Sequence, residues 1–259
     1  MSEKVSVVMA AYNGEMYIEE SVRSILGQTL KNFEFIIVDD GSTDGTFDKL
    51  QQIDDPRLRI IRQRNQGQTS ALIAGIKQAK GDLIARLDDD DYSLPNRLMH
   101  QLEFMEAHPK VCLCGSRFQE LDRGNLITQR VPFVQTNTKI KKIMSFYNPF
   151  AHSSVMFRRG AYFKVGGYSN NYTISMDYDL WLRLMDVGEV YNIDEAFTVI
   201  RLHDNSVSMK QERLKIMEGI EIRCRAYRKY RGNIFLAGFY FFKSIMGLIL
   251  PRWVKVSFE

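Results

Sequence analysis

Between residues 5 and 87, segments with the pattern of a strand alternate with segments that have the pattern of a helix, and this alternation constrains the fold most. The strand segments are short apolar runs, several of them rich in β-branched residues, and the helix segments carry apolar residues at helical spacing. Strands are expected at residues 5–10, 33–38, 58–61 and 83–87, and helices at 15–26, 46–50 and 67–79. This order predicts a mainly parallel sheet with helices on its faces. Right-handed crossovers would bring the loops after Ala10, Val38 and Leu87 to the same edge of that sheet.

Four consecutive carboxylates, Asp88 to Asp91, follow the fourth strand, and Pro95 opens the next helical stretch. Ligands of open α/β sheets bind at this place, outside the carboxyl ends of the strands. Two carboxylates ~4 Å apart repel by ~1 kcal/mol in water and by about 4 kcal/mol near a protein surface. The run is therefore either a solvated turn or a site neutralised by a cation. The flanking strand and helix favour a metal site, with Mg²⁺ or Mn²⁺ as the cations that suit oxygen ligands.

The composition excludes several classes of protein. A chain of 259 residues with 45% hydrophobic and 25% charged residues is an ordinary globular protein, with one large domain or one domain and an appendage. A formal net charge of +4 is too small to indicate a nucleic-acid partner, and none is expected. Three cysteines without a C-x-x-C pair, and a first strand that starts close to Met1 without a signal-peptide pattern, favour a reducing, cytoplasmic location.

The glycine-containing turns lack the known phosphate-binding patterns. Neither G-x-G-x-x-G nor G-x-x-x-x-G-K-[ST] occurs in the sequence. Asp39 and Asp40, at the end of the second strand, are therefore candidates to bind ligand hydroxyls or an amide, as a strand-end carboxylate binds ribose in dinucleotide folds. The alternative is an Asx-turn or a helix cap. We expect one of the two to cap and the other to bind.

Six sequence motifs, in this order, resemble those of the family 2 glycosyltransferases, which have the GT-A fold. They are V-S-V-V-M-A-A-Y-N (5–13), I-I-V-D-D-G-S-T-D-G-T (36–46), A-R-L-D-D-D-D-Y-S-L-P (85–95), V-G-G-Y-S (165–169), S-M-D-Y-D-L-W-L-R (175–183) and R-L-H-D-N-S-V-S (201–208). The resemblance implies an α/β fold with a Rossmann-like, mostly parallel sheet flanked by helices. It also implies an enzyme that transfers a sugar from a nucleoside diphosphate donor to a hydroxyl with inversion, of the hexosyl- or N-acetylhexosaminyl-transferase class.

On the donor side, the resemblance assigns roles to residues of the first half. Ala10, Tyr12 and Asp40 match the wall that holds the base and ribose. Asp88 and Asp90 match the two acids of the D-x-D motif, which meet the ribose and a divalent metal, Mn²⁺ or Mg²⁺.

Further roles fall on the following acid and on the second half. Asp91 is the next acid, and the sequence does not separate its role from that of Asp90. Arg201 is expected to contact phosphate and His203 the metal or phosphate, although His203 can equally be an ordinary surface residue.

The general base for the acceptor hydroxyl matches Asp177. A positioned carboxylate can accept the proton of an attacking hydroxyl, and no second nucleophile is needed for inversion. Met176 stands where the family often has Glu, so Asp177 must act without an acidic neighbour. Other departures are Ala10 or Ala11 in place of Pro and Ile73 in place of Asn.

UDP is the expected donor nucleotide, and a growing glycan or a lipid-linked saccharide is the expected acceptor. Three alternatives remain open: a non-catalytic nucleotide-sugar or glycan binder on the same fold, a sugar nucleotidyltransferase and a retaining glycosyltransferase. The nucleotidyltransferase would need a glycine-rich phosphate loop near its first strand, which residues 10–14 do not provide.

The second half contains residues for which a structural role is as plausible as a functional one. His152 lies in an expected loop and is either a packing residue or part of an acceptor site. Asp179 is expected to point away from Asp177 and to complement the helix dipole or assist a cap. Trp181 and Leu184 are expected in the core.

We divide the chain into a catalytic domain (1–208), with a nucleotide-binding half (1–92) and an acceptor half (93–208), and a C-terminal helical extension (209–259). The extension combines a basic helix at 209–231 with an apolar segment at 234–250. That segment is short of the ~20 apolar residues of a spanning helix and carries Lys243. It fits an interfacial helix at the cytoplasmic face of a membrane. The alternative is a helix packed on the catalytic domain or on a second subunit of a homodimer.

Overall fold

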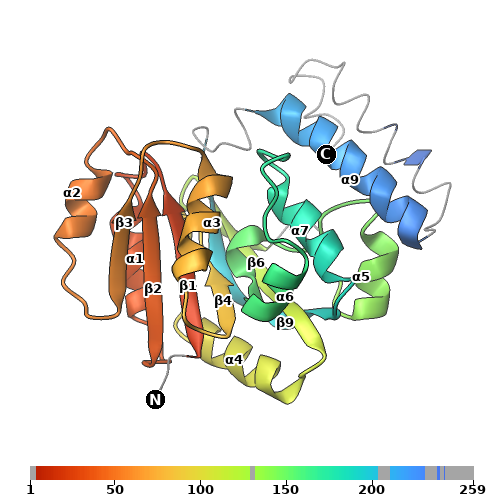
Figure 1. The fold of residues 1–259 in the computed structure, drawn as a ribbon, viewed down its shortest axis with the longest axis horizontal. Helices are drawn as coiled ribbons and strands as arrows, with labels where there is room; N and C mark the ends of the chain where they lie inside the picture. Colours follow the sequence, from red (N-terminus) through yellow and green to blue (C-terminus); the bar gives the residue numbers. More distant parts are fainter. Residues whose placement is uncertain (1–3, 129–131, 204–210, 231–237, 240–241, 243–259) are drawn as a thin grey trace.

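The computed structural model describes residues 4–128, 132–203, 211–230, 238, 239 and 242. Within these residues the strands form a nine-stranded sheet in the order β3-β2-β1-β4-β8-β6-β9-β5, with β7 paired to β6 (Figure 1). The first part of this sheet is parallel. It consists of β1 (Val5–Ala11), β2 (Phe33–Asp39), β3 (Leu58–Arg62) and β4 (Leu83–Arg86). The four strands predicted from the sequence are thereby confirmed, with ends that differ by at most one residue.

A short antiparallel strand joins this parallel part to the rest of the sheet. β8 (Met156–Arg158) pairs with β4 on one side and with β6 (Val111–Asp122) on the other. β9 (Glu189–Leu202) then pairs with β6 in parallel and with the short β5 (Tyr92–Ser93) in antiparallel orientation. β7 (Asn125–Thr128) forms a hairpin with β6.

One strand assignment from the sequence was wrong. Separate strands were expected at 191–193 and 197–200, but β9 is continuous from Glu189 to Leu202. The register opposite β6 shifts between Ser116 and Arg117, where Asp194 and Glu195 are paired with no residue of β6 and form a bulge, and again between Arg117 and Phe118, where Phe197 is unpaired. A bulge accommodates extra residues without ending a strand, which explains why this polar pair does not break it.

Helices cover both faces of the sheet because alternate strand residues point to opposite faces. Val5, Val7 and Met9 of β1 pack against α1 (Ile18–Leu26) and α4 (Arg97–Ala107), while Val8 and Ala10 pack against α3 (Gln68–Gln78). The remaining helices are α2 (Thr46–Gln51), α5 (Asn137–Ile143), the 3₁₀ turn η1 (His152–Ser154), α6 (Arg159–Lys164) and α7 (Met176–Leu184).

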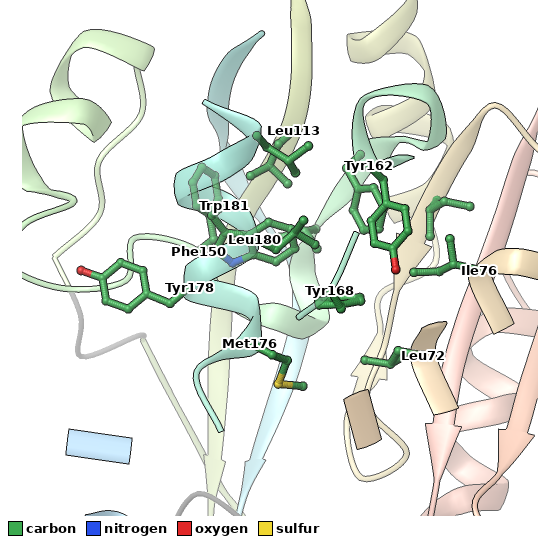
Figure 2. Close-up of a cluster of buried hydrophobic side chains, with 14 of the residues drawn as sticks. Leu72, Ile76, Leu113, Phe150, Tyr162, Tyr168, Met176, Tyr178, Leu180 and Trp181 are labelled. Atoms are coloured by element: carbon green, nitrogen blue, oxygen red, sulfur yellow. The ribbon is translucent and has the colours of Figure 1, made fainter. Parts of the chain in front are cut away.

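The core on the α3 face continues into the second half of the chain. Figure 2 shows Leu72 and Ile76 of α3 near the aromatic residues that surround Trp181 of α7. Trp181 and Leu184 are fully buried, as predicted. The two halves therefore share one hydrophobic core, and the sheet crosses between them without a linker.

The C-terminal extension begins with α9 (Glu212–Tyr230), the predicted basic helix, which lies across α7 (Figure 1). Ile222 and Ala226 of α9 are buried in the same core as Trp181. Almost all of the predicted apolar segment 234–250 lies outside the described residues. Among the residues that are described, no helix has both the length and the apolar character needed to cross a bilayer.

Candidate active site

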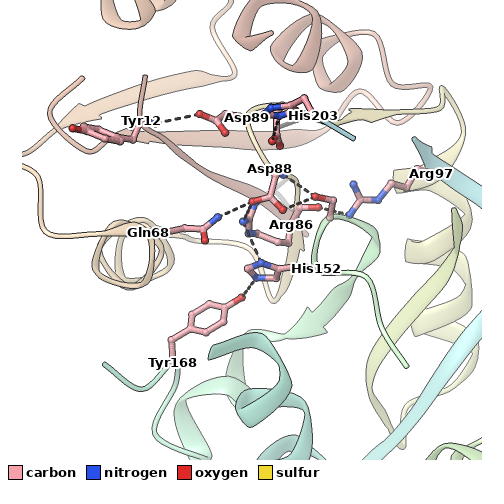
Figure 3. Close-up of polar contacts among 11 residues, drawn as sticks. Tyr12, Gln68, Arg86, Asp88, Asp89, Arg97, His152, Tyr168 and His203 are labelled. Atoms are coloured by element: carbon pink, nitrogen blue, oxygen red, sulfur yellow. Dashed lines mark hydrogen bonds and ion pairs between the residues drawn. The ribbon is translucent and has the colours of Figure 1, made fainter. Parts of the chain in front are cut away.

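The loops after β1 and β4 and the start of α3 meet at one edge of the sheet (Figure 3). The backbone N–H of Tyr12 donates to Asp89 Oδ2 at 3.1 Å, and Gln68 Nε2 donates to Asp88 Oδ1 at 2.8 Å. The sequence predicted that the Tyr12 and Asp88–Asp91 loops share this edge, and the contacts confirm it. The contact between Gln68 and Asp88 was not predicted, because a glutamine at the start of a helix looks the same in the sequence as an ordinary surface residue.

The charge of Asp88 is neutralised by Arg86, the last residue of β4. The side chain of Arg86, which is 1% exposed, pairs with Asp88 Oδ1. Ser153 Oγ donates to Asp88 Oδ2 at 2.7 Å and accepts the Asp88 N–H at 3.0 Å. Burial alone would raise the pKa of Asp88, but the Arg86 guanidinium and these hydrogen bonds lower it to about 2. Asp88 is thus a fixed carboxylate that stays ionised.

The next three acids are in the opposite electrostatic situation. Burial, together with the charges of Asp90 and Asp88, raises the pKa of Asp89 to about 8. The pKa of Asp91 also lies well above its usual value because of burial and the charges of Asp90 and Asp88. In the part of the chain that the structure describes, no lysine or arginine side chain forms an ion pair with Asp89, Asp90 or Asp91. Ionisation of these carboxyls is therefore disfavoured in the protein alone, and a bound cation would favour it.

The end of β9 closes against these acids. His203 Nε2 lies 2.9 Å from Asp90 Oδ2, and the backbone N–H of Arg201 donates to Asp91 Oδ1 at 2.8 Å. The Arg201 guanidinium donates to the Asp90 carbonyl at 2.9 Å and pairs with Glu20 Oε2 at 2.7 Å. The structure therefore brings together Arg201, His203, Asp90 and Asp91, which lie about 110 residues apart in the sequence.

A second buried arginine supports the acid loop from α4. Arg97 is fully buried, and its Nη2 donates to the carbonyls of Arg86 at 2.6 Å and Val155 at 3.1 Å. Its Nη1 donates to Ser93 Oγ at 2.8 Å. These bonds fix both ends of the loop to β8 and α4. Arginine is rarely fully buried without specific partners, but the burial of Arg97 is visible only in the structure, so the sequence offered no signal for this role.

A cleft of about 480 Å³ opens beside the acids. It is lined by Tyr12, Asn13, Gly14, Glu15, Met16, Tyr17, Asp44, Lys49, Asp89, Asp90 and His203. The ring of Tyr12 is half exposed at its wall, so an aromatic surface is available for stacking. The predicted residues Tyr12, Asp90 and His203 therefore share one cleft.

Ala10 and Asp40 do not line this cleft. Ala10 is buried in the core on the α3 face. Asp40 is 2% exposed and accepts hydrogen bonds from Gln63 Nε2 at 2.7 Å, from the N–H of Gln66 at 3.0 Å and from the N–H of Gly67 at 2.7 Å. Both oxygens of Asp40 thus hold the loop before α3 in place.

Asp39, the neighbour of Asp40, also has partners within the protein. It pairs with Arg62 at 3.1 Å and accepts the Ser42 N–H at 3.3 Å. The Ser42 bond is the local turn contact expected for one member of the pair.

Asp177 lies in the first turn of α7 and is half-buried. Asn148 Nδ2 donates to Asp177 Oδ2 at 2.8 Å, and the Tyr178 N–H donates to Oδ1 at 2.7 Å. Burial raises the pKa of Asp177 to about 6, against the lowering effect of these hydrogen bonds. The carboxylate is thus oriented by two donors and has a proton affinity suited to general base catalysis near neutral pH.

Met176 explains the missing acidic neighbour. Its side chain is 2% exposed and lies in the core cluster of Trp181 and Leu72 (Figure 2). A carboxylate in this apolar environment would be costly to ionise. The position beside Asp177 is a packing position in this chain.

His152 belongs to a buried network beneath Asp88, and was only weakly indicated by the sequence. Its Nδ1 lies 3.3 Å from Arg86 Nη2 and its Nε2 lies 2.7 Å from the Tyr168 hydroxyl (Figure 3). Burial and the Arg86 charge lower the pKa of His152 to about 3, so the ring is neutral. Arg86 can only donate, and Nδ1 is therefore the acceptor and Nε2 carries the proton. Arg86, Ser153 and Tyr168 were missed as site residues because the topology, not the sequence spacing, places them here.

Comparison with known proteins identifies this arrangement. The family model described as "Glycosyl transferase family 2" matches residues 6–166. The chain belongs to glycosyl transferase family 2. Its relatives within the family include the putative glycosyltransferase EpsE of Bacillus subtilis, with 38% identity over 209 residues that cover 76% of this chain and 73% of EpsE. A second relative is the Escherichia coli UDP-Glc:alpha-D-GlcNAc-diphosphoundecaprenol beta-1,3-glucosyltransferase WfaP. It is 32% identical to the present chain over 252 residues, which cover 95% of each of the two chains.

Solved structures confirm the predicted GT-A fold of this family 2 glycosyltransferase. S. aureus TarS 1–349 in complex with UDP-GlcNAc superimposes with a TM-score of 0.72 at 17% identity, covering 93% of this chain and 71% of TarS. The mannosyltransferase PcManGT from Pyrobaculum calidifontis, in complex with GDP-Man and Mn²⁺, gives a TM-score of 0.62 at 15% identity, covering 99% of this chain and 83% of that one. Because the sequence identities are this low, these two comparisons show only that the fold is the same. The family relationship shows that the chain is a glycosyltransferase.

Proposed function

We propose that this chain is a metal-dependent, inverting glycosyltransferase that moves a sugar from a nucleoside diphosphate donor to a hydroxyl of a glycan or lipid-linked acceptor. The donor nucleotide is UDP. WfaP uses a UDP-sugar by its name, and TarS was solved with UDP-GlcNAc, which supports this choice for the chain. The 480 Å³ cleft beside the acid loop receives the nucleotide, with Tyr12 against the base.

The contrast within the acid loop carries the proposal. Asp88 is matched by Arg86, whereas Asp90 and Asp91 face His203 and a backbone N–H within the described part of the chain. A protein that only needed a stable turn would gain from neutralising all of these carboxylates. A cation would favour the ionised form of these carboxyls, and their place next to an open cleft supports a divalent cation as part of the substrate complex.

The donor atoms of this site fit Mn²⁺ or Mg²⁺. Among the described residues, no three His, Cys, Asp or Glu side chains converge as a ready-made metal site. Divalent cations at nucleotide sites use one or two carboxylates and take their other ligands from phosphates and water. Asp90 and Asp91, with His203 beside them, would hold the ion, and Asp88 would hold the ribose. A bound cation would stabilise negative charge on the departing diphosphate.

Asp177 then acts on the acceptor. As the acceptor hydroxyl attacks the anomeric carbon, its proton passes to the Asp177 carboxylate, which Asn148 and the Tyr178 N–H keep oriented. The new bond forms opposite the leaving diphosphate, so a single displacement inverts the anomeric configuration. NMR of the anomeric proton of the product tests this, because a retained configuration would exclude a single displacement.

Thermal stability with nucleotides tests the donor site first. UDP, GDP, dTDP and CDP are added in turn, each with Mn²⁺ and with a chelator. A ligand at ~100 times its Kd stabilises by about 2.7 kcal/mol, which is a shift of roughly 5–10 °C for a chain of this size. A shift with UDP that the chelator abolishes is expected. No shift with any nucleotide on folded protein would contradict the proposal and favour a glycan binder.

A lipid-linked acceptor would place the enzyme at the cytoplasmic face of a membrane. WfaP acts on a diphosphoundecaprenol-linked sugar by its name. In this chain α9 exposes the cationic residues Arg213, Lys215, Arg228 and Lys229, which anionic headgroups would attract. Flotation of the full chain with anionic and with neutral liposomes tests a peripheral contact. Light scattering at the same concentrations shows whether the extension instead pairs two copies in a homodimer.

A further inference from the structure

The start of α7 is held by a residue from the C-terminal extension. Glu218 of α9 accepts backbone hydrogen bonds from Thr173 at 2.7 Å, Ile174 at 3.0 Å and Ser175 at 2.7 Å. Glu218 is 8% exposed, and its two oxygens are aimed at this one stretch of backbone. Asp177 follows two residues after Ser175.

These contacts lie at the N-terminus of α7. The first N–H groups of a helix have no partner within it, and a side chain at the N-cap usually provides one. Ser175, the N-cap residue of α7, makes no such side-chain bond. A carboxylate that accepts several N–H groups near a helix N-terminus forms strong, charge-assisted bonds that also complement the helix dipole. Glu218 binds the N–H of the N-cap residue and of the two residues before it, and so fixes the turn that leads into α7 from more than 40 residues away in the sequence.

A second set of contacts fixes α9 in the position from which Glu218 reaches this backbone. Arg225 Nη1 donates to Asp179 Oδ1 at 2.7 Å and to the Tyr172 hydroxyl at 2.8 Å. The Tyr172 hydroxyl donates to Glu221 Oε1 at 2.6 Å. Asp179 is 2% exposed and also pairs with Arg183. Residues on both sides of Asp177 are thus bound to the same helix.

We propose that Glu218 is a positioning residue for catalysis, which sets the placement of Asp177 through the backbone of residues 173–175. This inference rests on the proposed role of Asp177 as the general base. Asp177 is oriented directly by Asn148, but the position of its Cα depends on the turn that Glu218 holds. A displacement of about 1 Å at a reacting group can lower a rate by ~100-fold, so a small relaxation of this turn would be felt in the chemical step. The C-terminal helix is then part of the active site's framework.

The test compares Glu218→Gln with Glu221→Gln, the same substitution three residues later on α9. The amide of the Glu218→Gln variant would keep one acceptor and turn an NH₂ group toward backbone donors, whereas the amide oxygen of the Glu221→Gln variant can still accept the one bond that Glu221 receives, from the Tyr172 hydroxyl. For Glu218→Gln we expect kcat to fall by about 10- to 100-fold, with KM and Kd for the UDP-sugar within about twofold of the parent. Hydrogen exchange of the amides at 173–175 should accelerate in this variant. Glu221→Gln should keep kcat within about threefold of the parent.

Asp177→Asn is measured in parallel, so that the two ideas can fail separately. A fully active Asp177→Asn enzyme would refute the proposed base and with it the role of Glu218. An inactive Asp177→Asn enzyme together with an unchanged Glu218→Gln enzyme would refute the positioning role alone. Equal losses of kcat in the Glu218 and Glu221 variants would show general loosening of α9 and also overturn it. If Glu218→Gln does not fold, Glu218→Asp, which keeps the charge but shortens the side chain, is judged by the same split between kcat and KM.

Discussion

The proposed donor edge, around Asp88, and the proposed acceptor edge, around Asp177, are built in different ways. At the donor edge, Asp88 is fixed by Arg86, two residues before it, and by Gln68 and Ser153 at the ends of neighbouring elements. At the acceptor edge, Asp177 depends on Asn148 and on a turn held by Glu218, both far away in the sequence. The first site follows from the topology of a parallel sheet, and the second depends on how irregular segments pack around it.

Removal of Arg86 is expected to have the largest effect, and it tests how far the donor edge depends on one charge pair. Arg86→Met leaves the Asp88 carboxylate without its partner, which typically costs about 3–5 kcal/mol for a buried pair. The free energy of unfolding from urea titration measures this. Arg86→Met/Asp88→Asn should regain much of the loss because no lone charge remains. A single variant as stable as the parent would contradict the pairing described here.

Asp177→Asn tests the acceptor edge alone. We expect kcat to fall by ~10³-fold, within the range for loss of a general base, while the chelator-sensitive shift with UDP persists. Initial rates with a radiolabelled UDP-sugar measure the first quantity and thermal stability the second. A loss of UDP binding in this variant would show that the two edges are not independent.

Asp90→Asn is the matching change at the donor edge. It should lower kcat/KM by about 100-fold and abolish the difference between Mn²⁺ and chelator in the thermal shift, because the metal loses a carboxylate. Asp54→Asn, at an exposed position before β3 and so at the opposite end of the parallel strands, is the same substitution and should leave both quantities unchanged. If Asp90→Asn keeps its metal dependence, the cation binds elsewhere.

The pH dependence gives the smallest and most specific effect. Asp177 accepts a proton only when ionised, and burial raises its pKa to about 6. Below that pH the ionised fraction, and with it the transfer rate, should fall by about tenfold per pH unit, and above it the rate should level off. Asn148 stabilises the ionised form of Asp177, so Asn148→Ala should raise the pKa and move the acidic limb of the pH–rate profile to higher pH. If the acidic limb of the pH–rate profile does not move in this variant, a group other than Asp177 controls the rate.

The difference between the edges also explains what the sequence could predict. The four parallel strands and the shared edge of the Tyr12 and Asp88–Asp91 loops follow from periodicity and from crossover handedness, and the structure confirms them. The neutralisation of Asp88 could have been suspected from Arg86, a charge inside an apolar strand.

Other contacts could not be predicted from the sequence. Neither Asn148 at Asp177 nor Glu218 at the start of α7 lies at a distinctive spacing from its partner. Such contacts depend on three-dimensional packing, which local patterns do not encode. Asp40 shows the same limit, because the sequence indicated a strand-end carboxylate but not the loop at 63–67 that occupies it.

The bulge in β9 has a consequence for how insertions and deletions would act. Successive side chains of a strand alternate between its two sides, so the number of residues before Arg201 decides which side it faces. Arg201 and His203 both contact the acid loop, while Leu202 between them is partly exposed. Deleting Glu195 alone would reverse this parity and turn both side chains away from the acids, whereas deleting Asp194 and Glu195 together would preserve it. The side on which Arg201 and His203 meet the acid loop thus depends on two residues farther back along the same strand.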